Sequence, residues 1–366
     1  MALQCGIIGL PNVGKSTIFN ALTASSVPAE NYPFCTIDPH QGIVPLPDKR
    51  LNELARIYKA QKITPATVEF IDIAGLVRGA NKGEGLGNRF LGQIRQVAAL
   101  VHVVRCFEDN NVTHVEASLD PVRDAEIIKT ELLLADLETI QKRLNKVAKS
   151  AKVGEKHFRH ELEVLNRLLD HCNQGRMARE FEVADDDISI LNKLFLLTQK
   201  PVLYVANVDE NEIEKEQRSP VVQALFDFAE QEGNLAIRLC GKLEAELASM
   251  PDEDKEFFLS EYHLPEPGLD KLIHASFKLL GLQTFYTGAV NEVRAWTIPV
   301  GATAWEAAGE IHTDFQRGFI KAEVCKYDDL IRLGSEKAVR EAGLVQLHGK
   351  DYVVEEGDVI FFKFNV

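Results

Sequence analysis

Short apolar runs recur along the first part of the chain and predict the strands of a sheet. They cover residues 6–8, 67–73, 98–106, 201–207 and 235–241. A run that is apolar over most of its length is typical of a buried strand. A helical spacing of apolar residues follows the first run, at residues 18–22. Strands that alternate with helices predict an α/β fold with a mostly parallel sheet.

A long helical pattern interrupts these strands between residues 125 and 200. Leucines and isoleucines recur there in two stretches, 127–144 and 162–169, each of which gives a helix one apolar face. We expect two antiparallel helices packed as a coiled-coil-like hairpin. Because the strand pattern returns at residue 201, this hairpin (residues 125–200) is predicted to be an insertion within one domain that covers residues 1–280.

The composition changes after residue 280. Strand-like runs at residues 293–298, 318–324, 352–354 and 359–364 are joined by glycine-rich turns, and helical stretches lie near residues 304–310 and 327–332. This pattern predicts a small α+β domain over residues 281–366. Because it has no catalytic cluster of its own, we expect it to be a docking domain.

The stretch Gly9–Thr17 reads Gly-Leu-Pro-Asn-Val-Gly-Lys-Ser-Thr and directly follows the first apolar run. Its glycines let the backbone wrap a phosphate, and Lys15 places an ammonium on the β- and γ-phosphates of a nucleotide. The Ser16 hydroxyl is a ligand for Mg²⁺. This strand–loop–helix context predicts a P-loop nucleotide site. The residues expected to bind the nucleotide here are Asn12, Val13, Gly14, Lys15, Ser16 and Thr17.

Two later segments carry further groups that a nucleoside triphosphate requires. Thr36 lies in a polar stretch with prolines and is expected to provide a second hydroxyl for Mg²⁺, although an ordinary loop threonine is the alternative. Asp72 ends a strand and can hold Mg²⁺ through water, while Gly75 can turn its N–H onto the γ-phosphate. Many GTPases next have a glutamine that orients the attacking water. The chain has Leu76 instead, so hydrolysis must use another group.

His114, in the polar loop after residues 98–106, is a candidate for positioning that water, and a surface loop histidine is the alternative. The tetrad Asn207-Val208-Asp209-Glu210 stands where GTPases carry Asn-Lys-x-Asp. Its lysine is absent and its last residue is Glu, so the standard guanine clamp is broken. We therefore predict a relaxed or adenine-preferring site, with Asn207, Val208 and Glu210 at the base and the end of the run 235–241 beside it.

The net charge of −14 argues against general coating of nucleic acid. The predicted hairpin tip is nevertheless basic, which indicates either an RNA or other phosphate-rich partner, or simply a solvated helix face. The basic residues of this tip are Lys142, Arg143, Lys146, Lys149, Lys152, Lys156 and Arg159.

The six cysteines are far apart in the sequence and are expected to be reduced thiols. Cys5, Cys106 and Cys240 lie in apolar runs and are expected in the core, whereas Cys35 lies beside Thr36, where redox sensing is an open alternative. No run reaches the length of a membrane span, and the first residues lack the pattern of a targeting signal. The cytoplasm is the expected location.

These motifs resemble the Obg-like ATPase (YchF) family of translation-factor-related P-loop proteins, and the resemblance covers essentially the whole chain. It rests on residues 9–17, 31–39, 72–80 and 83–88, on Asn207 with Glu210, and on residues 295–303, 311–315 and 349–353 of a C-terminal part similar to a TGS domain. The resemblance implies a ubiquitin-like β-grasp fold for the C-terminal domain. One departure is Asp209, since an uncharged residue is common at that position in the family.

The resemblance also implies ATP preferred over GTP, Mg²⁺ at Ser16 and Thr36, slow hydrolysis assisted by His114, association with ribosomes and a role in stress responses. The leading hypothesis is a Mg²⁺-dependent ATPase with Lys15, Gly75 and His114 as catalytic groups and Ser16, Thr36 and Asp72 at the metal. A nucleotide-sensing binding module in which hydrolysis is incidental and an ordinary GTPase are the alternatives. The expected partners are ATP and ribosomal RNA or protein. We expect no membrane binding and no sequence-specific DNA binding, and the expected oligomeric state is a monomer.

Overall fold

The computed structural model describes residues 4–24, 40–73, 86–108, 118–151 and 156–365. The chain divides into two compact units: residues 1–42 with 69–272, and residues 43–68 with 273–366. We refer to them as the first and the second unit.

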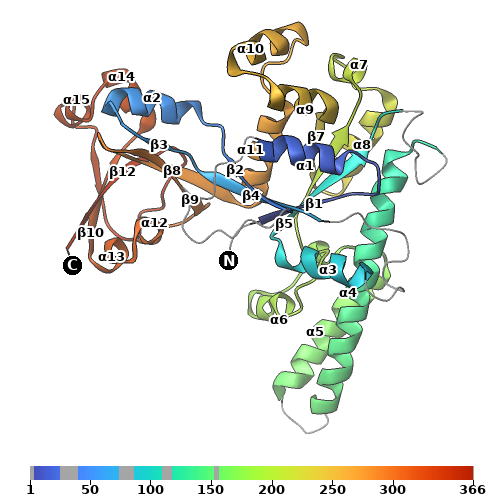
Figure 1. Ribbon diagram of the computed structural model, residues 1–366. Coiled ribbons are helices and arrows are strands. Elements are labelled where there is room, and N and C mark those ends of the chain that lie inside the picture. The colour runs from blue at the N-terminus through green and yellow to red at the C-terminus, as the bar shows by residue number, and fades with distance from the viewer. Residues whose placement is uncertain (1–3, 25–39, 74–85, 109–117, 152–155, 366) are drawn as a thin grey trace. The chain divides into compact units, whose positions relative to one another are not determined.

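The first unit is built on a mostly parallel sheet, as the apolar runs predicted (Figure 1). Its strand order is β2-β4-β1-β5-β6-β7. The pairs β1–β4, β1–β5, β5–β6 and β6–β7 are parallel, and β5 and β6 are buried along their whole length. The strands are β1 (Gln4–Ile8), β2 (Gln41–Pro45), β4 (Thr67–Asp72), β5 (Ala99–Arg105), β6 (Val202–Asn207) and β7 (Leu235–Leu239). The carboxyl ends of β4, β1, β5, β6 and β7 therefore meet at one edge, where open parallel sheets bind their ligands.

Helices cover both faces of this sheet. Figure 1 shows α1 and α9 on one face and α3 with the start of α4 on the other. The helices that follow the strands are α1 (Lys15–Ala24), α3 (Leu86–Gln96), α7 (Glu210–Ile213), α8 (Pro220–Gln231), α9 (Gly241–Ser249), α10 (Asp252–Glu261) and α11 (Gly268–Leu279). Glu244 of α9 is buried and accepts the N–H groups of Gly268 and Leu269 at 2.8 and 3.1 Å, so one helix caps the start of another.

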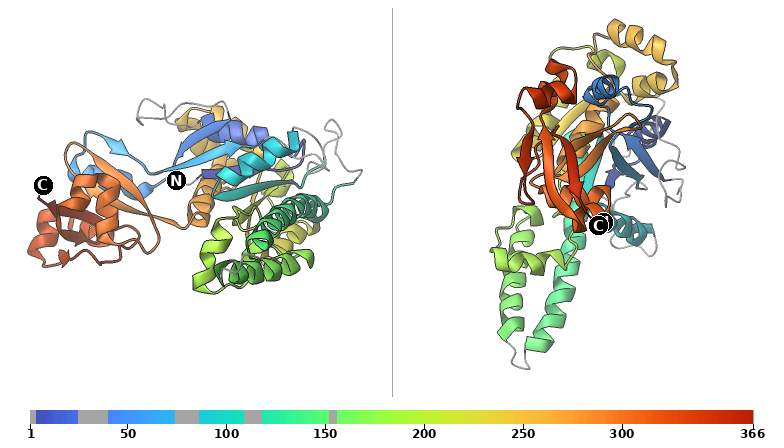
Figure 2. Two further views of the ribbon diagram at one scale, coloured as in Figure 1. Left: turned by 90° about the horizontal axis from the view of Figure 1, so that it is seen from below. Right: turned by 90° about the vertical axis from the view of Figure 1, so that its left-hand side faces the viewer.

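The predicted helical hairpin is present between β5 and β6. It consists of α4 (Pro121–Ala151) and α5 (Lys156–Asn173), and it projects from the first unit in Figures 1 and 2. Short helices close its base: η2 (Ala178–Glu180), η3 (Asp185–Asp187) and α6 (Ile188–Asn192). The core of the hairpin includes Ile140, Leu144, Val164, Leu165 and Leu168, which confirms the apolar faces read from the sequence.

A buried carboxylate attaches this hairpin to the chain that leads into β6. Asp136 of α4 is fully buried and accepts hydrogen bonds from the N–H groups of Leu197 and Thr198, both at 2.8 Å, and from the Thr198 hydroxyl at 2.7 Å. Burial raises the pKa of Asp136, although these three hydrogen bonds oppose the shift. The hairpin is therefore fixed at its base by specific polar contacts as well as by its apolar core.

The second unit has the β-grasp topology that the resemblance implied. An antiparallel hairpin of β8 (Leu282–Gly288) and β9 (Val293–Pro299) is followed by α12 (Ala304–Ile311), and β12 (Val359–Phe364) lies parallel to β8 in the middle of the sheet. The remaining strands are β10 (Phe319–Cys325) and β11 (Gln346–His348), and the remaining helices are α13 (Thr313–Arg317), α14 (Tyr327–Leu333) and α15 (Glu336–Glu341). Of the runs expected to be strands, residues 352–354 give only an isolated bridge between Thr303 and Val353.

The second unit also takes in residues 43–68, which the sequence pattern alone did not indicate. These residues form α2 (Lys49–Tyr58) and β3 (Ile63–Thr64), and β3 adds to the edge of the β-grasp sheet beside β9. Arg50 donates to Glu356 at 2.6 Å and to Asp48 at 3.0 Å, and the Tyr286 hydroxyl also donates to Asp48. The segment joins this unit through a two-residue strand, polar contacts and the packing of Tyr58 near Phe361, all of which connect residues distant in sequence.

Candidate nucleotide-binding site

The loop between β1 and α1 has the backbone form of a phosphate-binding loop. Asn12 and Gly14 have positive φ angles of 62° and 89°, and the Ile18 N–H donates to the Gly14 carbonyl at 3.0 Å as α1 begins. A Cβ on Gly14 would lie 2.1 Å from the Asn207 side-chain nitrogen, so both the φ angle and the space require glycine. The predicted strand–loop–helix unit is therefore confirmed, with the N-terminus of α1 directed at the site that a phosphate would take.

Lys15, the first residue of α1, is buried and forms an ion pair with Asp72 at the end of β4. The register of β1 and β4 explains this contact, because Ile7 and Asp72 are partners in the parallel ladder. Two residues that the sequence assigned to phosphate and to Mg²⁺ thus lie side by side. Nucleotide phosphates compete with this carboxylate for the Lys15 ammonium, so binding a nucleotide requires the pair to be rearranged or shared.

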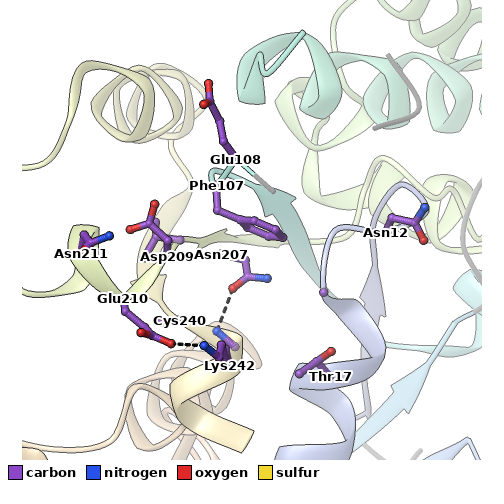
Figure 3. A pocket seen from close by; sticks show the side chains of 13 residues that line it. Asn12, Thr17, Phe107, Glu108, Asn207, Asp209, Glu210, Asn211, Cys240 and Lys242 are labelled. Carbon is purple, nitrogen blue, oxygen red and sulfur yellow. Dashed lines mark hydrogen bonds and ion pairs between the residues drawn. The ribbon is translucent and has the colours of Figure 1, made fainter. Parts of the chain in front are cut away.

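The Asn207 side chain joins three parts of the site. It is buried, its amide nitrogen donates to the Val13 carbonyl at 2.8 Å, and its oxygen accepts from the Gly241 N–H at 2.9 Å. The end of β6, the P-loop and the start of α9 are therefore held together through one amide, and Figure 3 shows its bond to the start of α9. Such a buried and doubly bonded amide fixes its surroundings more firmly than an exposed one, because either group left unpaired costs free energy.

The other residues of the tetrad have separate roles. Val208 is 3% exposed, so its side chain lies in the core. Asp209 caps α7 by accepting the Glu212 N–H at 2.8 Å, which explains a charged residue where the family commonly has an uncharged one. Glu210 forms an ion pair with Lys242 of α9 at 2.7 Å (Figure 3). The carboxylate at the end of the tetrad is therefore engaged by a lysine, and this contact raises the pKa of Lys242.

These groups surround a cavity of about 500 Å³ beside the P-loop. A cavity of this size is within the range of small-ligand pockets. Its lining residues are Asn12, Gly14, Thr17, Phe107, Glu108, Asn207, Val208, Asp209, Glu210, Asn211, Cys240, Gly241 and Lys242. The sequence-predicted residues Asn12, Gly14, Thr17, Asn207, Val208 and Glu210 are thus brought together. The Val13 carbonyl accepts a hydrogen bond from Asn207, and Lys15 forms its ion pair with Asp72. Ser16 is exposed on the first turn of α1.

The sequence reasoning missed Phe107 and Lys242 as parts of this pocket. Phe107 follows β5 and is held by Arg105, which donates to its carbonyl at 3.1 Å and places its guanidinium carbon 4.6 Å from the ring centroid. Aromatic rings of this kind provide stacking surfaces for nucleotide bases. Both residues lie just beyond a strand, after β5 and after β7. Strand ends at the ligand-binding edge were therefore the signal available for finding them.

Ser16 and Asp72 are the described residues that fit the implied Mg²⁺. A hydroxyl and a carboxylate oxygen are hard donors of the type Mg²⁺ prefers, and it commonly takes only one or two protein oxygens beside phosphate and water. The register of β1 and β4 places both at the same edge of the sheet. Among the described residues no group of three or more His, Cys, Asp and Glu forms a metal site. One hydroxyl and one carboxylate suit a Mg²⁺ ion that takes its other ligands from phosphate and water.

Several predicted residues lie outside the described part of the chain. They are Cys35, Thr36, Gly75, Leu76, His114 and Lys152. Of the cysteines expected in the core, Cys5, Cys106 and Cys240 are buried, which confirms the expectation. Burial raises the pKa of the Cys240 thiol, which lies at the pocket and precedes α9. None of the helices in the described segments combines the length and apolar composition that a bilayer crossing requires.

Two family models match the chain. Residues 4–135 match MMR_HSR1, described as a 50S ribosome-binding GTPase, and residues 282–365 match YchF-GTPase_C, described as a protein of unknown function. The first match covers the P-loop and the start of the hairpin. The second coincides with the β-grasp part of the second unit.

Full-length relatives are similar at high identity. The ribosome-binding ATPase YchF of Escherichia coli O157:H7 is 49% identical over 366 residues, and that of Bacillus subtilis (strain 168) is 50% identical over 366 residues; both matches cover 100% of each chain. The solved structure of the Schizosaccharomyces pombe YchF GTPase is 35% identical, with a TM-score of 0.88, and the match covers 99% of this chain and 98% of that one.

Proposed function

The chain belongs to the YchF family, and from this membership and the geometry of its pocket we propose that it is a Mg²⁺-dependent ATPase. It binds ribosomes, prefers ATP over GTP, hydrolyses ATP slowly and acts as a nucleotide-controlled switch in translation or stress regulation. Its relatives from Escherichia coli and Bacillus subtilis carry the name ribosome-binding ATPase. We also propose that it acts as a monomer in the cytoplasm.

The preference for ATP is proposed from the contacts that the two carboxylates of the tetrad, Asp209 and Glu210, already make. Guanine presents its N1–H and 2-amino groups as donors, and GTPases meet them with a free aspartate. Here Asp209 is committed to the N-terminus of α7, and Glu210 is engaged by Lys242. Each carboxylate therefore already has a partner with which guanine would have to compete, and this competition weakens the interaction that favours guanine over adenine.

The hydrolytic chemistry is supported by the groups around the P-loop. Lys15 stabilises negative charge that develops on the β- and γ-phosphates, and the backbone N–H groups of the loop hold the phosphates in place. Ser16, Thr36 and Asp72 are the residues proposed to hold Mg²⁺, which would neutralise negative charge on the phosphates. Gly75 donates its N–H to the γ-phosphate. Without a glutamine at position 76, His114 is the residue proposed to position water.

His114 can be tested separately from nucleotide binding. His114→Ala should slow single-turnover hydrolysis and leave the affinity for ATP near that of the unchanged protein, because the residue is proposed to act on water and not on the base. Unchanged hydrolysis in this variant would remove His114 from the mechanism.

Ribosome binding is proposed to involve the hairpin tip. Lys142, Lys146, Lys149 and Arg159 are exposed there, and within the described residues Lys146 and Lys149 have no ion pair, whereas Lys142 pairs with Glu138. When lysine side chains neutralise rRNA phosphates, the counterions condensed on the RNA are released. The association of the protein with ribosomes should therefore weaken as the salt concentration increases. Lys146→Gln with Lys149→Gln should reduce both co-sedimentation with ribosomes and its salt dependence, and Lys337→Gln in the second unit is the control. Salt-independent association would exclude the hairpin as an RNA contact.

The decisive test of the proposed function is calorimetric titration of the protein with non-hydrolysable ATP and GTP analogues in Mg²⁺. We expect the ATP analogue to bind more tightly. A preference for the GTP analogue would overturn the ATPase assignment and make the protein an ordinary GTPase. Ribosome binding without measurable hydrolysis would favour a nucleotide-sensing module instead.

A further inference from the structure

Acidic residues are concentrated in one part of the first unit. Residues 209–266 carry sixteen Asp and Glu against five Lys and Arg, in a chain whose net charge is −14. This segment runs from the pocket through α8 and α9 to α10. Figures 1 and 2 show α10 at the end of the first unit opposite to the tip of the α4–α5 hairpin. The acidic surface and the basic hairpin tip are therefore separated in space.

Helix α10 carries an apolar side chain on its outer, acidic face. Phe257 is 69% exposed, and Glu253, Glu256 and Glu261 of the same helix are also exposed. The spacing of four residues places Glu253, Phe257 and Glu261 on one side of the helix. Phe258, by contrast, is half-buried, and its ring centroid lies 4.9 Å from that of Tyr262. Phe257 therefore remains in solvent while Phe258 has an aromatic neighbour.

We propose that this face of α10, defined by Phe257 with Glu253, Glu256 and Glu261, docks a lysine- and arginine-rich segment of another protein that also carries an apolar side chain. An exposed aromatic ring surrounded by carboxylates offers both parts of such a contact. The ring provides apolar area that becomes buried, and buried aromatic residues contribute much of the affinity of protein interfaces. The carboxylates attract a basic segment and increase its rate of association.

The negative charges of this face disfavour nucleic acid, the other class of partner that binds exposed aromatic rings. Single-stranded nucleic acid stacks on exposed rings, but such sites lie in positively charged grooves that follow the phosphate backbone. The surface around Phe257 has the opposite sign. A protein segment is therefore the occupant that the charge of this face favours.

The acidic surface continues from α10 to the nucleotide pocket. Tyr262 directly follows α10, and its pKa is raised by burial and by the negative charges of Glu210 and Glu246. Glu210 lines the pocket and is paired there with Lys242.

The proposal can be tested with the full-length protein and without ribosomes. The probe is a fluorescent amphipathic peptide of lysine and leucine, and the control peptide has the same charge with serine in place of leucine. We expect the leucine peptide to bind more tightly, and Phe257→Ala to weaken it about tenfold, which is typical of a buried aromatic anchor. Glu253→Gln with Glu256→Gln and Glu261→Gln should reduce the salt dependence of binding. Phe195→Ala, at another aromatic residue that is 57% exposed, should leave binding unchanged.

Equal affinity of the unchanged protein and Phe257→Ala for the leucine peptide would overturn the proposal. The proposal would also be overturned if an oligouridine probe bound to the protein and Phe257→Ala weakened that binding, because the face would then be a nucleic-acid site. Neither readout depends on ATP hydrolysis or on ribosome binding. Failure here therefore leaves the proposed function unaffected, and failure of the proposed function leaves this test unchanged.

Discussion

The Asn207 side chain donates a 2.8 Å hydrogen bond to the carbonyl of Val13 and thereby ties the end of β6 to the P-loop. Its oxygen accepts from the Gly241 N–H at 2.9 Å. One buried amide thus couples the base side of the pocket to the phosphate side. The first residue of the tetrad proposed to meet the base is also the residue that contacts the P-loop backbone.

Replacing Asn207 with Ala should therefore lower both stability and nucleotide affinity. The change leaves a buried carbonyl and a buried N–H without partners, which should cost about 1–3 kcal/mol in the free energy of unfolding. Urea unfolding and calorimetric titration with ATP measure the two effects. Asn145→Ala, which removes an exposed hydrogen bond to Gln141 on the hairpin, is the control and should change neither. Normal ATP affinity in Asn207→Ala would show that the P-loop keeps its form without this brace.

Gly14→Ala should damage the same loop by a different route. The new methyl group would lie 2.1 Å from the Asn207 side-chain nitrogen, and the residue would have to keep a φ angle of 89°. We expect ATP affinity to fall more than tenfold, because the loop must move to relieve the clash. Gly175→Ala is a matched control, since Gly175 has a φ angle of 81° and no neighbour within 4 Å of the added carbon. It should cost only the backbone strain, about 1–2 kcal/mol of stability, with ATP affinity intact.

The P-loop, β4 with Asp72 and β6 with Asn207 could be predicted from the sequence because each is a local pattern. A strand, the turn that follows it and the next helix are encoded by consecutive residues, and the order of the strands then fixes which ends meet. The α4–α5 hairpin was predictable for the same reason, since its two apolar faces are periodic.

Other parts of the site depend on contacts between distant residues. The pairing of Glu210 with Lys242 requires β7 and α9 to lie beside β6. Likewise, β3 has only two residues, and its pairing with β9 joins parts of the chain far apart in sequence. No local pattern encodes such contacts.

Lys242→Met should shift base preference without affecting the fold. The Lys242 side chain is 71% exposed, so its ion pair with Glu210 is screened by solvent and contributes little to stability. Freed from the lysine, Glu210 can accept hydrogen bonds from guanine. We expect the ratio of GTP to ATP affinity to rise by up to about fivefold, which corresponds to about 1 kcal/mol. Calorimetry with both nucleotides measures this ratio.

Lys215→Met provides the comparison for this variant. Lys215 is another exposed lysine and pairs with Glu212 of α7 at 3.0 Å, outside the pocket. Its removal should leave the nucleotide ratio unchanged. If Lys242→Met also left the ratio unchanged, the engagement of Glu210 could not be the cause of adenine preference.

His102 should make the protein less stable as the pH falls. The residue lies in β5, is 3% exposed, and packs 5.3 Å from the ring of Tyr204. Burial lowers the pKa of His102 to about 3, because the charged imidazolium is poorly solvated in the core. In the unfolded chain the same group binds its proton below about pH 6.5. Between these two values the unfolded state binds more protons, so acidification favours unfolding, by at most about 1.4 kcal/mol per pH unit from this residue.

The contribution of His102 can be separated from that of the many carboxylates by comparing variants over a pH series. His102→Phe keeps an aromatic ring beside Tyr204 but cannot be protonated. Its free energy of unfolding relative to the unchanged protein should therefore increase steadily as the pH is lowered from about 7 toward 4, the window in which the unfolded histidine is charged and the folded one is neutral. His274→Gln, at an exposed histidine, should give a curve parallel to that of the unchanged protein. Parallel curves for His102→Phe as well would mean that His102 is protonated in the folded protein at the same pH as in the unfolded chain, in conflict with its burial in β5.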